Sequence, residues 1–166
     1  MIVINEEIKI DTPSGDVFYK NLTNFVVEKF EQTKIMEGLC LIVTLHTTCS
    51  IFFEEYMHDF DENGYELLQA DLNQVFDNII PKQTSNEDIY KHPGEKHIEF
   101  AISRGSSEYL TSNTDAHIKS TFIGNSVILP INNGKLEKGE LGSIYFVDFD
   151  WKRERTRTVL VKFFGI

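Results

Sequence analysis

The sequence predicts an α+β fold in which two main helices pack on a largely antiparallel sheet or sandwich. Two segments carry apolar residues at helical spacing, and several apolar runs of strand length lie between turn-forming residues. The chain has 166 residues, 41% of them hydrophobic, which is enough for one well-packed core. Because no repeat, linker or low-complexity tract divides it, we expect a single domain over residues 1–166.

The strands are predicted from short apolar runs bounded by glycine, proline, asparagine and aspartate. The first run ends at the Asp11–Gly15 break, and a later one is closed by Asn132-Asn133-Gly134. The predicted strands cover residues 2–10, 39–45, 50–56, 127–131, 142–149 and 156–164. The last two are expected to pair as a hairpin across residues 150–154.

The helices are predicted from the 3.6-residue spacing of apolar side chains. The first covers residues 18–34, and the second runs from about Leu67 to Ile79, after an acidic turn and before Pro81. A short helix is expected over residues 114–122. Residues 82–113 are the least regular part of the chain, with loop-like segments at Lys91–Gly94 and Arg104–Ser107.

Composition excludes several classes of protein. The net charge of −10 argues against nonspecific nucleic-acid binding, which depends on Lys and Arg neutralising phosphates. No apolar run approaches the roughly 20 residues of a membrane helix, and the N-terminus lacks a basic signal-peptide region. Cys40 and Cys49 lie in apolar runs and are too few for a disulfide scaffold. We therefore expect a reduced, cytoplasmic protein with no membrane partner.

Three histidines are candidates for a metal or anion site, although each alone is more consistent with a structural role. His46 follows the apolar run 39–45, His92 precedes Pro93-Gly94, and His117 lies on a predicted helical turn. Their spacing matches no short zinc motif. Three imidazoles can nevertheless bind zinc when a fold brings them together. His58 and His97 lie in polar segments and are not included.

Charged residues suggest further roles. Glu54 and Glu55 end a predicted strand, where only one of them can point the same way as His46. Arg153, Arg155 and Arg157 are spaced by two, so that a strand would present all three on one face. Such a stripe suits phosphate recognition. Equally, it suits an exposed strand that resists aggregation through its charge.

Several segments, in order along the chain, resemble the motifs of the YjbQ-like family, also called secondary thiamine-phosphate synthases. The first is His46-Thr47-Thr48-Cys49-Ser50 with Glu55 after it, and the second is Ile89-Tyr90-Lys91-His92. Ala116-His117-Ile118-Lys119-Ser120 precedes Gly124-Asn125-Ser126 and the strand to Ile131. The later matches are Gly134-Lys135-Leu136 and Arg155-Thr156-Arg157 with Gly165. Extra residues relative to the family occur around 57–66 and 97–110.

The resemblance implies a mixed sandwich assembled as a homotrimer, with a site near the subunit boundary. It implies a weak transferase activity that joins a pyrimidine diphosphate to a thiazole phosphate and releases pyrophosphate. The site residues that it implies are His46, His92 and His117 for a divalent metal such as zinc, Glu55 and His117 for catalysis, and Lys135, Arg155 and Arg157 for a phosphorylated small molecule. Two alternatives stay open. One is a non-catalytic assembly or ligand-binding protein, motivated by Lys138–Gly142 replacing the family's Trp-Gln pair. The other is a metal-dependent hydrolase.

Overall fold

The chain folds into two antiparallel sheets with helices against them, as a computed structural model describes for residues 1–84 and 89–166. This confirms the predicted α+β class. The strands are β1 (Ile2–Thr12), β2 (Phe18–Asn21), β3 (Gly38–Thr44), β4 (Cys49–Glu55), β5 (Ser126–Asn132), β6 (Lys135–Leu136), β7 (Gly142–Asp148) and β8 (Arg155–Gly165). The helices are α1 (Thr23–Glu31), α2 (Leu67–Ile79), α3 (Glu95–Ser103), α4 (Glu108–Thr111) and α5 (Thr114–Ile123).

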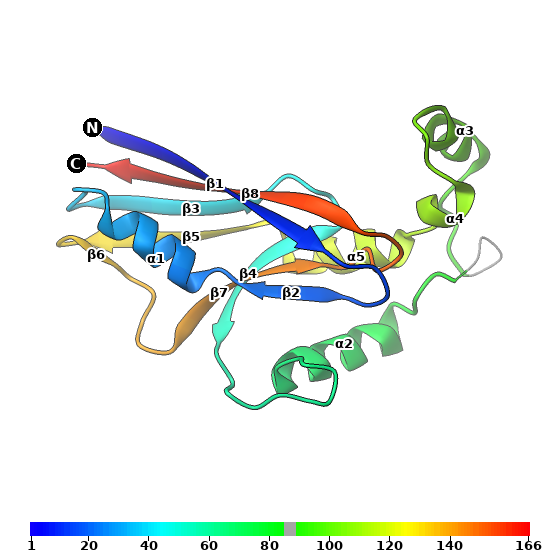
Figure 1. Ribbon diagram of the computed structural model, residues 1–166, viewed down its shortest axis with the longest axis horizontal. Helices are drawn as coiled ribbons and strands as arrows, with labels where there is room; N and C mark the ends of the chain where they lie inside the picture. The colour runs from blue at the N-terminus through cyan, green and yellow to red at the C-terminus, as the bar shows by residue number, and fades with distance from the viewer. Residues whose placement is uncertain (85–88) are drawn as a thin grey trace.

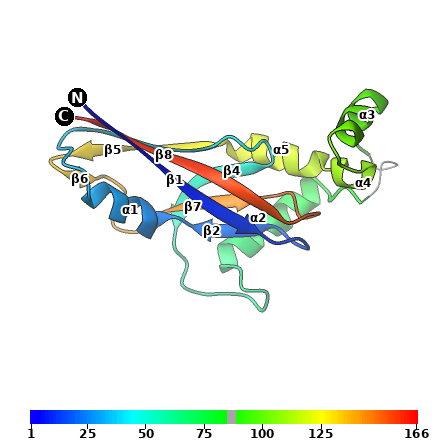
Figure 2. The ribbon, with the colours of Figure 1, turned by 45° about the horizontal axis from the view of Figure 1, so that its top comes forward.

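The larger sheet has the strand order β1-β8-β3-β5-β6, and the smaller one has the order β2-β7-β4. Long β8 lies between β1 and β3, with Ile2 opposite Gly165 and Thr12 opposite Arg155. Both chain ends therefore lie together at one end of the molecule, while α3 and α4 lie at the other (Figure 1). A second view shows the same separation (Figure 2).

Two apolar clusters hold these elements together. One lies between the two sheets and beneath α1, and includes Val26, Ile42, Ile51, Phe146 and Phe163, each at most 1% exposed. The other joins α2 and α5 to the smaller sheet through residues such as Phe76, Ala116 and Phe149. Burial alternates along β3 and β8, as the period of two requires, whereas six consecutive residues of β7 are buried because both of its faces are covered.

The predicted helix over residues 18–34 is wrong in its first turn. Phe18–Asn21 instead forms β2, which pairs with β7 through Phe18 opposite Asp148 and Asn21 opposite Tyr145. The Asn21 side chain then accepts a hydrogen bond from the Thr23 backbone at 2.9 Å, where α1 begins. Pairing with a distant strand thus overrides the helical spacing of the apolar residues.

The predicted hairpin of the last two strands is also wrong. β7 pairs with β2 and β4, whereas β8 pairs with β1 and β3, so the chain changes sheets at residues 149–154. We call this turn the corner. The carboxylate of Asp148 accepts the Asp150 backbone N–H at 3.0 Å, which bends the chain out of β7.

Residues 82–113, the least regular part of the prediction, contain the helices α3 and α4, which the sequence did not predict, while residues 85–88 lie outside the described residues. The loops expected around His92 and Arg104 are confirmed. Cys40 and Cys49 are both free and buried. Among the described helices, none has the length and apolar character needed to span a membrane.

Candidate functional site

A basic cleft opens where the corner meets α3, α4 and α5. Its volume is about 410 Å³. Five basic side chains line it, namely His97, Arg104, His117, Arg153 and Arg155. Among residues 1–84 and 89–166, no acidic side chain lines it. In a chain with a net charge of −10, this local excess of positive charge favours an anionic ligand.

The corner is fixed to the helices by polar contacts. Buried Lys152 donates to the backbone carbonyls of Ser112 and Tyr109, the latter at 3.1 Å. Asn113 donates its amide to Asp150 Oδ2 at 3.3 Å. Arg153 donates to the same Asp150 oxygen at 3.2 Å, which holds its guanidinium at the edge of the cleft.

Arg155 has an unsatisfied hydrogen-bond donor among the described residues. Its Nε–H is buried and has no hydrogen-bond partner within the described chain. Burial, together with the neighbouring charges of Arg153 and Arg157, lowers the pKa of Arg155. A guanidinium nevertheless stays protonated. An anion in the cleft would therefore supply the missing acceptor and offset the repulsion between the arginines.

Three histidines gather beside this cleft. The ring centroids of His92 and His97 are 4.8 Å apart, and those of His92 and His117 are 5.8 Å apart. His92 lies in the loop before α3, His97 on α3 and His117 on α5, so that three separate segments contribute. Helix α3 therefore supplies a histidine that sequence analysis had left out.

The orientation of His92 is set by Gln83 and Thr114. Fully buried Gln83 donates to the His92 carbonyl and accepts the Thr114 N–H, each at 2.8 Å. The Thr114 hydroxyl also donates to the His92 carbonyl at 2.8 Å, and it contacts His92 Nδ1 at 2.9 Å. Because the hydroxyl has one proton, we assign the ring proton to Nδ1. Nε2 of His92 then keeps its lone pair.

His92 and His117 are both held toward the neutral form. Burial lowers the pKa of His117, although a hydrogen bond to the Thr47 backbone and the carboxylate of Asp150 oppose that shift. Burial also lowers the pKa of His92, and the nearby His97 and His117 lower it further. Neutral imidazoles can accept protons or bind metals, as the predicted roles require.

His46 lies apart from this histidine group. Its Nε2 accepts the Thr158 backbone N–H at 3.0 Å, and it lines a separate depression with Ser120 and Gly124. No ring contact joins it to another histidine in residues 1–84 and 89–166. Over the same residues, no group of three or more His, Cys, Asp or Glu side chains converges as metal ligands. The predicted trio of His46, His92 and His117 thus does not fit an ion within this chain.

Arg157 is committed to the fold. It is 6% exposed and grips Asp148 with two hydrogen bonds, Nε to Oδ2 at 2.6 Å and Nη2 to Oδ1 at 3.1 Å. Although burial opposes it, the Asp148 carboxylate holds the pKa of Arg157 above its usual value. Its Nε and Nη2 are engaged by Asp148 and Thr48, and Arg157 is not among the described lining residues of the cleft, so it supports a ligand site there only indirectly.

The remaining predicted residues lie away from the cleft. Glu55 ends β4, six residues beyond Cys49, and lines a different pocket with Glu66 and Leu72. At about 3.3 Å per residue, Glu55 lies about 20 Å from Cys49 along β4. Lys135 is exposed in β6, at the opposite end of the molecule from α3 and α4 (Figure 1). Within one chain, neither residue joins the histidines.

Sequence reasoning missed His97 and Arg104 as lining residues of the cleft. Both fall within the extra residues around 97–110, where no motif matches the family. The signal that could have found them is basic character in a segment that the family lacks. Their placement depends on where α3 packs against α4, which no local pattern predicts.

Comparison with known proteins now gives the family. A sequence model of the family described as "UPF0047 protein YjbQ-like" matches residues 6–166. The chain belongs to the YjbQ-like UPF0047 family. A UPF0047 protein of Archaeoglobus fulgidus is 33% identical over 126 residues, which cover 76% of this chain and 77% of the relative. The UPF0047 protein YugU of Bacillus subtilis is 30% identical over 145 residues, covering 87% and 88%.

Solved structures agree with the fold. A crystal structure of an uncharacterised YjbQ/UPF0047 family protein from Clostridium acetobutylicum superposes with a TM-score of 0.68 at 26% identity, covering 96% of this chain and 99% of that one. A protein of unknown function from Sulfolobus solfataricus gives a TM-score of 0.68 at 22% identity, covering 99% and 100%. The second likeness concerns the fold alone. These two proteins are described as uncharacterised or of unknown function, so a function for this chain has to be inferred from the residues of the cleft.

Proposed function

We propose that this protein binds the phosphate or diphosphate group of a small molecule in the basic cleft. The observation that carries the proposal is the buried Arg155 Nε–H, which has no partner within the described chain. It belongs to a cleft whose described lining residues include five basic side chains and no acidic one. Guanidinium groups match phosphate oxygens in geometry and charge. Arg155 would bind the phosphate directly, with Arg153 and Arg104 at the edge.

The reaction suggested by the family resemblance is displacement of pyrophosphate from a pyrimidine diphosphate by a thiazole phosphate. Arginines placed at the diphosphate would stabilise the charge that develops on the leaving pyrophosphate. In this transfer the thiazole ring nitrogen bonds to the carbon that carries the diphosphate, and the bond from that carbon to the diphosphate oxygen breaks. His117 lines the same cleft and His92 lies beside it, so that an imidazole is available to exchange a proton with the released pyrophosphate. We propose this transfer as the activity of the site.

We propose separately that the three histidines beside the cleft bind a metal ion, which the transfer reaction does not require. Nε2 of His92 keeps a lone pair, and His97 and His117 lie beside it. A zinc ion would need these rings to converge further, or a ligand from another copy. Elemental analysis of purified protein, alongside the His92→Ala variant, tests the idea. Bound zinc that depends on His92 would support it, and metal-free active protein would exclude it.

We also propose that the protein forms the homotrimer that the resemblance implies. Lys135 and Glu55 lie away from the cleft of their own chain, so that only a neighbouring copy could bring them to it. Sedimentation equilibrium tests the proposal directly. A mass near three times 19.2 kDa is expected, and a monomer at micromolar concentration would refute it.

The binding proposal is tested by calorimetric titration with pyrophosphate at pH 7.5 and low salt. We expect Arg155→Met to weaken binding by about tenfold to a hundredfold, as loss of a charged hydrogen-bond donor does. Lys162→Met is the matched control, because it removes one positive charge from an exposed position of the same strand. Equal affinities of Arg155→Met and wild type would overturn the proposal.

The reaction is tested by following pyrophosphate release from the pyrimidine diphosphate. Release that requires the thiazole phosphate and falls in His117→Gln identifies a transferase. Release without the thiazole phosphate identifies a hydrolase, with water as the nucleophile. Tight binding of pyrophosphate without turnover identifies a ligand-binding protein.

A further inference from the structure

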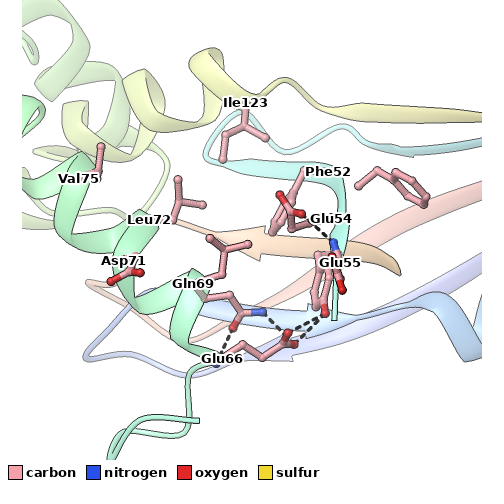
Figure 3. A pocket seen from close by; sticks show the side chains of 12 residues that line it. Phe52, Glu54, Glu55, Glu66, Gln69, Asp71, Leu72, Val75 and Ile123 are labelled. Atoms are coloured by element: carbon pink, nitrogen blue, oxygen red, sulfur yellow. Dashed lines mark hydrogen bonds between the residues drawn. The ribbon is translucent and has the colours of Figure 1, made fainter. Parts of the chain in front are cut away.

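A second pocket lies between α2 and β4, and it shares no lining residue with the basic cleft. Its volume is about 430 Å³, within the range of small-molecule sites. Leu72 on α2 and Ile123 at the end of α5 face Phe52 on β4 across the pocket (Figure 3). We call this space the α2–β4 pocket.

The walls of the α2–β4 pocket are apolar and aromatic. Phe52 and Tyr145 stack at 5.3 Å between ring centroids and 17° between planes, and Phe53 lies next along β4. Phe53, at 42% exposed, and Val75, at 55% exposed, leave apolar surface open to solvent. An apolar ligand would cover this surface, and aromatic faces also attract cations.

The charges of the α2–β4 pocket are all negative. Its titratable lining residues are the four acids Glu54, Glu55, Glu66 and Asp71, together with the Tyr145 phenol. No Lys, Arg or His belongs to the lining in the part of the chain that the structure describes. Glu54, Glu55 and Asp71 are exposed and form the rim, with Glu54 beside Phe52 in Figure 3. The sign of charge is thus the reverse of that in the basic cleft.

Glu66 brings one of these charges into the interior. It is 5% exposed and accepts hydrogen bonds from the Tyr145 hydroxyl at 2.8 Å, the Met57 N–H at 3.0 Å and the Gln69 amide at 3.3 Å. Burial raises the pKa of Tyr145, and the Glu66 carboxylate raises it further, so that the phenol stays the donor. In the described part of the chain, no basic side chain forms an ion pair with Glu66.

We propose that the α2–β4 pocket binds a lipophilic organic cation, an aromatic or alkyl ammonium whose apolar part packs between Leu72, Phe52 and Ile123. Its positive charge lies toward the acidic lining residues, of which Glu54 and Asp71 are exposed and Glu66 is buried. The apolar walls provide burial, and the uniform negative charge selects a cation over a neutral or anionic analogue of the same size.

The test compares three probes of similar shape, each titrated into the intact protein at pH 7.0 by calorimetry and by chemical-shift mapping. 2-Phenylethylammonium carries a positive charge, 2-phenylethanol is neutral, and phenylacetate is negative. We expect the ammonium to bind about tenfold more tightly than the alcohol, and phenylacetate more weakly still. The shifted amides should belong to α2 and β4.

Charge-removing variants identify the rim. Glu54→Gln combined with Asp71→Asn should lower the preference for the ammonium over the alcohol to about threefold or less, since two rim charges are lost without a change of size. Glu62→Gln is the control, because it removes an exposed charge from the acidic turn outside the pocket. Glu54 and Asp71 are both exposed, so the double variant should still fold.

Three results would overturn the proposal. The first is equal affinity for the ammonium and the alcohol, and the second is an unchanged preference in the double variant. The third is absence of binding together with dissociation of an oligomer by Leu72→Glu, which would show that a second copy of the chain fills the α2–β4 pocket.

Discussion

Replacing Arg157 with methionine should destabilise the fold rather than only impair ligand binding. The change leaves Asp148, at 2% exposed, without the guanidinium that now bonds it at 2.6 and 3.1 Å. Breaking a buried ion pair costs about 3–5 kcal/mol. Asp148 keeps hydrogen bonds from the Thr12 hydroxyl and the Asp150 N–H, each at 3.0 Å. We therefore expect the low end, about 3 kcal/mol.

Arg155→Met is the matched control, two residues away in the same strand. Within the described residues Arg155 has no ion pair, so its loss should change the free energy of unfolding by no more than about 0.5 kcal/mol. Urea denaturation at one fixed protein concentration measures both variants. For a chain of this length, about 3 kcal/mol corresponds to a loss of about 6–12 °C in Tm.

The double variant Arg157→Met/Asp148→Asn separates the ion pair from simple loss of packing. Because it removes both charges, it should be more stable than Arg157→Met alone. A cost below about 1 kcal/mol for Arg157→Met would refute the reasoning. Equal costs for Arg157→Met and Arg155→Met would refute it as well.

Three further predictions concern stability and are measured by urea or thermal denaturation. Burial lowers the pKa of His117 from 6.5, so that the unfolded chain takes up a proton more readily. The stability that neutral His117 contributes is therefore fully present above about pH 6.5 and is lost as the pH falls below that value. His117→Gln should make the free energy of unfolding less dependent on pH in this range. Gly38→Ala would place a Cβ 2.2 Å from the Phe164 carbonyl oxygen, which would force β3 and β8 apart. We expect the free energy of unfolding to fall by about 1–3 kcal/mol, and an unchanged Tm would contradict this. Glu66→Ala removes the acceptor of the buried Tyr145 hydroxyl and should cost about 1–3 kcal/mol, whereas a neutral effect would mean that water replaces the carboxylate.

Local patterns predicted most of the fold because most strands are buried on at least one face. The apolar runs 39–45 and 127–131 correspond closely to β3 and β5. Helix α3 escaped prediction because only Ala101 of its nine residues is buried, which leaves a weak periodic signal. The exchange of β7 and β8 between sheets depends on contacts across the whole chain, and adjacency in sequence favoured a hairpin instead.

The site was predicted only in part for a similar reason. A spacing of two placed Arg155 and Arg157 on one face, but it could not show that Asp148 engages one and leaves the other open to the cleft. His92 and His117 do lie together. The third ring beside them is His97 rather than His46, because His46 Nε2 is taken by the Thr158 backbone.

The corner at residues 149–154 has a consequence for how ligand specificity can diverge in such proteins. It joins the two sheets and also carries Arg153 at the cleft, so that substitutions there would disturb the fold together with the anion binding proposed for the cleft. Helix α3 supplies His97, and Arg104 follows as its C-cap, yet the helix buries a single residue of its own. New specificities are therefore more accessible through changes in α3, which leave the joint between the sheets intact.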